Sequence, residues 1–85
     1  MPLIRGQIVR SKAGRDKDSW LVVFEPKEDG ALLADGKHRP LERPKFKKAK
    51  HLAPTNRILD ESSLKTNRSV IRGLRDAIAT VGGEY

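Results

Sequence analysis

The order of apolar and polar residues divides the chain into a β-rich part and a helical end. Two stretches near the N-terminus have the composition of strands. The first opens at Gly6 and contains Ile8 and Val9, and the second is residues 19–25, SWLVVFE. β-branched and aromatic residues favour extended backbone. Because residues 19–25 are almost continuously apolar, we expect a central strand that is covered on both faces.

Three further short strands are expected, over residues 31–35, 37–42 and 45–52. Asp-Gly pairs and prolines mark the turns between them, and the prolines confine these strands to the edges or ends of a sheet. We interpret residues 53–56, APTN, as a turn that leaves the last strand. Five short strands joined by tight turns predict a small, curled antiparallel barrel.

The apolar spacing becomes helical after residue 66. Thr66 or Asn67 is suited to cap the helix at its N-terminus, and Gly82-Gly83 is suited to end it. We expect the apolar stripe to cover one face or opening of the barrel, and the alternative is that it binds a partner. The stripe consists of Val70, Ile71, Leu74, Ala77, Ile78 and Val81.

The predicted organisation is therefore a single small domain with an appended helix. The barrel spans residues 1–59, a polar connector spans residues 60–66, the helix packed on the barrel spans residues 67–81, and a tail spans residues 82–85.

Basic residues outnumber acidic ones, and the excess lies in one stretch. The 85 residues carry a formal net charge of +7 at pH 7. Residues 37–57 contain eight Lys and Arg and one Glu, whereas the segments before and after are each balanced. Such concentration favours a polyanionic partner, and the alternative is a solvated lysine run. Arg68, Arg72 and Arg75 share a helix face, which is either a solvated flank or a second phosphate-contacting ridge.

A basic loop is expected between the first two strands. Lys12, Arg15 and Lys17 surround Gly14 there. Glycine can adopt positive φ and allows a ligand's backbone to approach closely. This loop is either shaped for phosphate or an ordinary hairpin turn with solvated charges.

Candidate chemistry for an enzyme is weak. The chain has no cysteine, so neither a disulfide nor a thiolate metal site is expected. Ser62 and Ser63 lie in the connector, and His38 and His51 show no metal-binding spacing. We therefore expect no enzyme, no catalytic or metal-binding residue and no cofactor. The N-terminus has no long apolar run, which predicts no signal peptide, no membrane span and a cytoplasmic location.

Nucleic-acid binding suits the composition better. Lysine and arginine side chains neutralise phosphates and release counterions. Aromatic residues are few, which disfavours a stacking platform for single strands and favours recognition of folded RNA by backbone and shape. We expect Trp20 and Phe24 to pack in the core, with stacking of a base on Trp20 as the alternative.

The segment GQIVRSKAGRDK, followed by WLVVF, resembles the KOW motif. That motif is a strand, a glycine-containing loop and a second strand in small SH3-like barrels of ribosomal proteins and transcription factors. The later run ADGKHRPLERPKFKKAKHLAPTN is similar to KOW-domain RNA-binding proteins of the archaeal and eukaryotic large-subunit ribosomal protein fourteen family. There, too, a basic strand ends in a KHL-x-PT segment. The resemblance covers roughly residues 4–59.

The resemblance implies an SH3-like (KOW) five-stranded antiparallel barrel, and the C-terminal α-helix lies outside it. It implies a ribosomal or ribosome-associated component that holds folded ribosomal RNA through phosphates. Many KOW motifs have a second glycine where this chain has Asp18, a residue type that tolerates positive φ. The predicted RNA-binding residues form one basic surface: Lys12, Gly14, Arg15, Lys17, Lys37, Arg39, Lys45, Lys47, Lys48, Lys50 and His51.

A protein-interaction module is the alternative function. KOW barrels also dock protein partners, so the barrel edge or the helix would bind a transcription or translation factor, or a ribosomal protein. Charge placement and exposure of the helix stripe distinguish the two functions.

Overall fold

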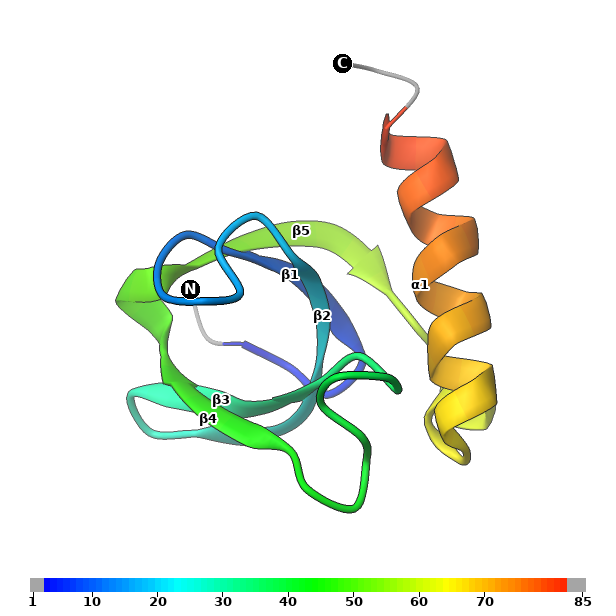
Figure 1. Ribbon diagram of the computed structural model, residues 1–85, viewed down its shortest axis with the longest axis horizontal. Coiled ribbons are helices and arrows are strands. Elements are labelled where there is room, and N and C mark those ends of the chain that lie inside the picture. Colours follow the sequence, from blue (N-terminus) through cyan, green and yellow to red (C-terminus); the bar gives the residue numbers. More distant parts are fainter. Residues whose placement is uncertain (1–2, 83–85) are drawn as a thin grey trace.

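The computed structural model describes residues 3–82, with side chains described for residues 3–79. These residues form one antiparallel sheet of five strands in the order β4-β3-β2-β1-β5, followed by a C-terminal helix (Figure 1). The predicted tail beyond residue 82 and the first two residues of the predicted barrel lie outside the described part. The elements are β1 (Gln7–Ser11), β2 (Trp20–Lys27), β3 (Gly30–Ala34), β4 (Lys45–Lys48), η1 (Ala49–His51), β5 (Leu52–Ile58), η2 (Glu61–Leu64) and α1 (Asn67–Gly82).

The strand predicted at residues 37–42 is wrong, because this segment is a loop. The Asp35 carboxylate accepts hydrogen bonds from the backbone N–H groups of Lys37 and Arg39, at 2.8 and 2.7 Å. A side chain thus satisfies backbone donors that a strand would have offered to its neighbour.

The prediction of one strand over residues 45–52 is also wrong, because η1 divides it into β4 and the start of β5. Residues 53–56 do not form a turn but lie within β5. In the sheet order β5 is the last strand, where a proline such as Pro54 is tolerated.

The sheet curls strongly, so that β1 and β4 approach each other across the inside of the curl (Figure 1). The Lys47 ammonium on β4 donates to the Ser11 hydroxyl on β1 at 2.9 Å. Register shifts in β1 and β2 mark irregularities of the kind that bend strands. In the described part of the chain β4 pairs only with β3, and β5 only with β1, so the sheet is not closed.

Two apolar clusters lie on opposite faces of the sheet. Neighbouring residues of β2 supply both, since Val22 faces one cluster and Val23 the other. The prediction that this strand is covered on both faces is therefore confirmed. The cluster inside the curl contains Val9, Leu21, Val23, Ala31, Leu33 and Leu52. The cluster under the helix contains Ile8, Val22, Ala34, Leu64, Val70 and Leu74.

Helix α1 packs on the outer face of the curled sheet. Val70 and Leu74 are buried, Ala77 and Ile78 are half-buried against the same cluster, and Ile71 is 39% exposed. The Val81 side chain, predicted in this stripe, lies outside the described side chains. No helix of the described chain has the length and apolarity needed to cross a membrane.

Hydrogen bonds at its N-terminus fix the position of α1. Thr66 and Ser69 cap each other, because each side chain accepts from the other's backbone N–H at 3.0–3.1 Å. The Asn67 side chain accepts from the N–H of Leu41 at 2.7 Å and donates to Glu42. The loop of residues 35–44 is thereby fastened beside the helix.

Candidate nucleic-acid interface

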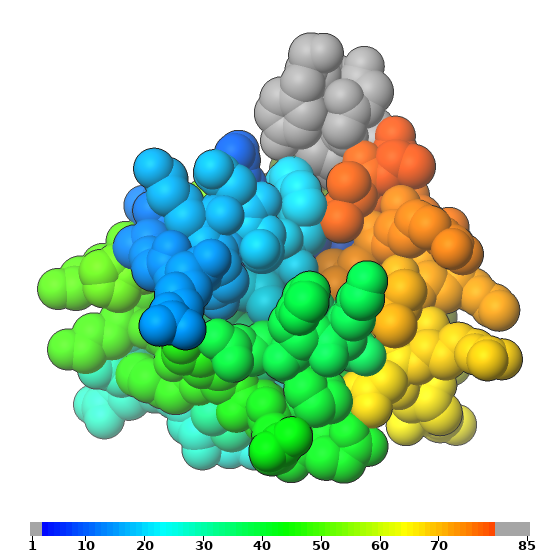
Figure 2. All heavy atoms as spheres, viewed as in Figure 1, coloured from blue at the N-terminus to red at the C-terminus, as the bar shows by residue number. Residues whose placement is uncertain are grey.

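Two loops meet at one end of the sheet, which we call the loop end. The first loop, residues 12–19, joins β1 to β2, and the second loop, residues 35–44, joins β3 to β4. Because these strands are antiparallel neighbours, both loops lie at the same end. Figure 2 shows them side by side, in blue and green, with α1 in orange along one side. The β2–β3 hairpin, with Glu28 and Asp29, lies at the opposite end.

Two residues with positive φ shape the first loop. Gly14 has a φ of +85° and Asp18 a φ of +72°. The Asp18 N–H donates to the Ser11 carbonyl at 2.7 Å, which closes the loop. Asp18 thus adopts the left-handed conformation, which aspartate tolerates better than most residues. Its carboxylate accepts from the Arg10 guanidinium at 2.8 Å, so its negative charge is paired.

Lys47 ties the first loop to β4. Its ammonium lies 2.5 Å from the Asp16 carboxylate and 2.7 Å from the Ala13 carbonyl oxygen. The Lys47 and Asp16 side chains are only 10% and 15% exposed. Burial by itself would raise the pKa of the Asp16 carboxyl, but its hydrogen bond to Lys47 and the lysine's charge together lower this pKa below its ordinary value.

The other cations of the two loops have no such partner. Lys12, Arg15 and Lys17 are exposed, and their side chains make no ion pair within the described residues. Arg15 and Arg39 line one hollow of about 430 Å³. The rest of its lining is Asp16, Ser19, Asp35 and His38. The backbone N–H of Lys12 donates to the His51 carbonyl at 2.8 Å, which brings η1 next to this loop.

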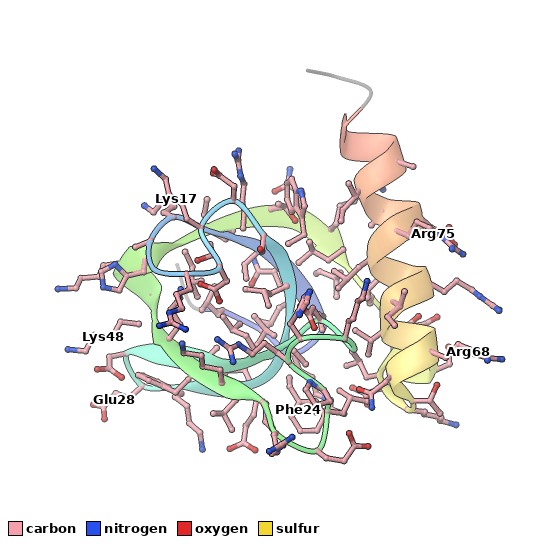
Figure 3. All side chains as sticks on the ribbon, in the orientation of Figure 1. Lys17, Phe24, Glu28, Lys48, Arg68 and Arg75 are labelled. Carbon is pink, nitrogen blue, oxygen red and sulfur yellow. The ribbon has the colours of Figure 1, made fainter. Side chains whose placement is uncertain are left out.

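Lys45 and Lys48 leave β4 on opposite sides. Lys45 shares the side of β4 from which Lys47 reaches the first loop, because both occupy alternate positions. Lys48 has the other parity and pairs with Gly30 beside the acidic hairpin. Figure 3 shows Lys48 near Glu28 and far from Lys17.

The predicted surface is thus brought together only in part. Lys47 is internal and Lys48 lies toward the opposite end. The loop end gathers seven of the others: Lys12, Gly14, Arg15, Lys17, Lys37, Arg39 and Lys45. The segment η1, with Lys50 and His51, runs between the two ends, because the N–H of Ala49 donates to the Asp29 carbonyl of the hairpin at 2.9 Å and the His51 carbonyl accepts from Lys12 of the first loop.

Carboxylates at the loop end are all engaged. Asp16 pairs with Lys47 and Asp18 with Arg10. Asp35 accepts from two backbone N–H groups, and Glu42 accepts from the Asn67 side-chain amide. The loop end therefore presents cations that form no ion pair with any carboxylate of the described chain. This arrangement favours the binding of an anionic polymer.

One feature of the loop end escapes sequence reasoning. A groove of about 590 Å³ lies between the start of β2, the second loop and α1. Trp20 and Ile71 line it, together with Arg75. Two signals in the sequence bear on it, the alternative of base stacking on Trp20 and the position of Ile71 at the margin of the helix stripe. Neither signal reveals that these two residues line one groove.

Neither a metal site nor a known relative adds to this picture. Among the described residues, no group of three or more His, Asp and Glu side chains could hold a metal ion. The chain matches no protein-family model, and no curated protein matches it either. The chemistry of the loop end therefore carries the functional conclusion.

Proposed function

We propose that this protein binds folded RNA through phosphate contacts at its loop end. The observation that carries the proposal is the convergence of cations from the two loops, none of which forms an ion pair within the described residues. Neutralising several phosphates at once releases counterions, which is the main source of such affinity. Arginines add bidentate contacts, and Arg15 and Arg39 line one hollow in which a phosphate would meet both.

The proposal includes an SH3-like barrel of the KOW type. The strong curl and the placement of η1 between β4 and β5 support it. The resemblance to the KOW motif covers β1, the first loop and β2, and the positive φ of both Gly14 and Asp18 suits that motif. The family that the sequence resembles suggests a ribosomal or ribosome-associated component, and ribosomal RNA is the ligand we propose.

Recognition is expected to depend on shape more than on sequence. Flexible lysines and arginines on loops follow a phosphate backbone and carry little base information. A-form RNA offers its phosphates and 2′-hydroxyls for such contacts. We propose no catalytic role for the protein.

A protein-interaction module is the second candidate. The groove beside Ile71 favours it, because part of the helix stripe stays open there. The rest of the stripe disfavours this function, since Val70 and Leu74 are buried against the sheet and are not available to a partner.

Binding to a panel of ribosomal RNA fragments, with a duplex of unrelated sequence as the comparison, tests the proposal. We expect binding to all of them at low salt and one fragment that binds clearly more tightly than the duplex. Absence of binding at moderate salt would contradict RNA binding. It would direct the search to a protein partner.

A further inference from the structure

The groove at the loop end has an apolar wall and a volume suited to a small planar group. Its lining includes Ile71, Leu74 and Ile78 of α1, Ser19 at the end of the first loop and Trp20 at the start of β2. The volume of about 590 Å³ falls within the usual range of ligand sites, roughly 300–1,000 Å³. Figure 2 shows the recess where the blue, green and orange segments meet.

This groove adjoins the hollow that Arg15 and Arg39 line. Ser19, Asp35 and His38 line both. A strand with one phosphate between the two arginines would therefore have its adjoining base within reach of the groove.

The groove offers what a nucleotide needs. The half-buried Trp20 side chain provides aromatic surface in its lining. Lys37 and Arg75 line the groove, and neither side chain forms an ion pair within the described residues. An occupant should therefore combine an apolar, stackable body with negative charge, as a base with its phosphates does.

We infer that the groove receives one unpaired base of the RNA whose phosphates bind the loop end. The inference rests on the proposed function and makes it more specific. The preferred RNA is a folded RNA with a bulged or looped-out nucleotide, and Trp20 contacts its base. A continuous duplex has no unpaired base for the groove, so it would bind only through the cations of the loop end.

Two hairpin RNAs that differ at one position test this inference. One carries a bulged adenosine, and the other carries an abasic residue in its place. Trp20 is the only tryptophan of the chain, so its fluorescence reports on the groove alone. We expect both RNAs to bind, the bulged adenosine to quench the fluorescence, and its RNA to bind at least about fivefold more tightly, given the usual energy of base–aromatic stacking.

Two variants and a matched control localise the effect. Ile71→Ala removes part of the wall, and Ala79→Gln places a larger side chain at the groove. Both should reduce the preference for the bulged RNA and leave binding of the abasic RNA unchanged. Ile58→Ala removes another exposed isoleucine, away from the groove, and should preserve the preference.

The outcomes separate the two proposals. Equal binding of the two RNAs without quenching would overturn the inference and leave the proposed function intact. Failure of both RNAs to bind would overturn both proposals. If an acidic peptide that contains phenylalanine quenched Trp20 while neither RNA did, the groove would be a protein-binding site.

Discussion

The Lys47 ammonium on β4 lies 2.5 Å from the carboxylate of Asp16, in the loop that follows β1. Strands β4 and β1 are separated by two strands in the sheet, so this contact spans the inside of the curl. It holds the first loop over the end of the sheet, where Lys12, Arg15 and Lys17 are left free to meet a ligand. A lysine in the most basic stretch of the chain is thus structural.

Replacing Lys47 with methionine should destabilise the fold. The change leaves Asp16 without its cation in a largely buried place, and removal of one partner of a buried pair costs about 3–5 kcal/mol. Because both side chains keep some exposure, we expect a loss of about 2 kcal/mol in the free energy of unfolding by urea. Lys48→Met on the same strand is the control and should change stability by less than about 0.5 kcal/mol. Equal effects of the two changes would show that the buried contact does not matter.

Stability should depend on pH through Asp16. Its pKa is lowered in the folded protein, so its contribution is present above the unfolded pKa, near 3.8, and disappears as the pH falls through the lower folded pKa. Other carboxyls, such as Glu25 and Glu61, also have lowered pKa values, each mainly through a side-chain hydrogen bond to a cation. The informative quantity is therefore the stability difference between the wild type and Asp16→Asn. It should be positive at pH 6 and shrink below about pH 4, and a constant difference would contradict this account.

Replacement of Asp18 by glycine should be tolerated, whereas replacement by a β-branched residue should destabilise the fold. Its φ of +72° costs little for Asp and nothing for Gly, whereas valine is strongly disfavoured there. The lost ion pair with Arg10 is exposed and contributes at most about 1 kcal/mol. We expect Asp18→Gly to keep the melting temperature within a few degrees and Asp18→Val to lower it by about 5 °C or more. A Val variant as stable as the Gly variant would show that the loop relaxes freely.

Gly36 should not tolerate a side chain. Its φ is +80°, and a methyl group there would lie 2.5 Å from the carbonyl oxygen of Asn67, at the start of α1. The second loop would have to move away from the helix. We expect Gly36→Ala to cost about 2 kcal/mol, measured by urea unfolding. Gly14→Ala, at a similar φ but near the Lys47 side-chain end, should cost less.

Sequence patterns were sufficient for β1, the first loop and β2. The nearly continuous apolar run of residues 19–25 is a local signal that identified β2. The run is continuous because neighbours such as Val22 and Val23 fill two different clusters. The helix could be predicted equally well from the sequence, since its apolar stripe repeats over several turns.

One of the remaining errors has a local cause, and the others have long-range causes. The segment of residues 37–42 looked like a strand, but Asp35 binds its backbone N–H groups and leaves a loop. Lys47 cannot be distinguished from Lys48 by composition. Only their alternation on β4 and the curl of the sheet send one inward and the other toward the hairpin. The groove at Trp20 depends on where α1 sits, which no local pattern encodes.

The salt dependence of RNA binding, compared between two charge-matched variants, tests the central claim most directly. Lys12→Ala/Arg15→Ala removes two cations from the loop end. Lys65→Ala/Arg68→Ala removes two exposed cations near the start of α1, where Arg68 points away from the sheet (Figure 3). If the wild type engages about five or six phosphates, the plot of log K against log salt has a slope of roughly −4 to −5.

We predict that the loop-end variant reduces the steepness of that slope by nearly two, at about 0.9 for each lost contact. The helix variant should keep the wild-type slope. A flat salt response of the wild type, or equal loss in both variants, would contradict an RNA-binding surface at the loop end.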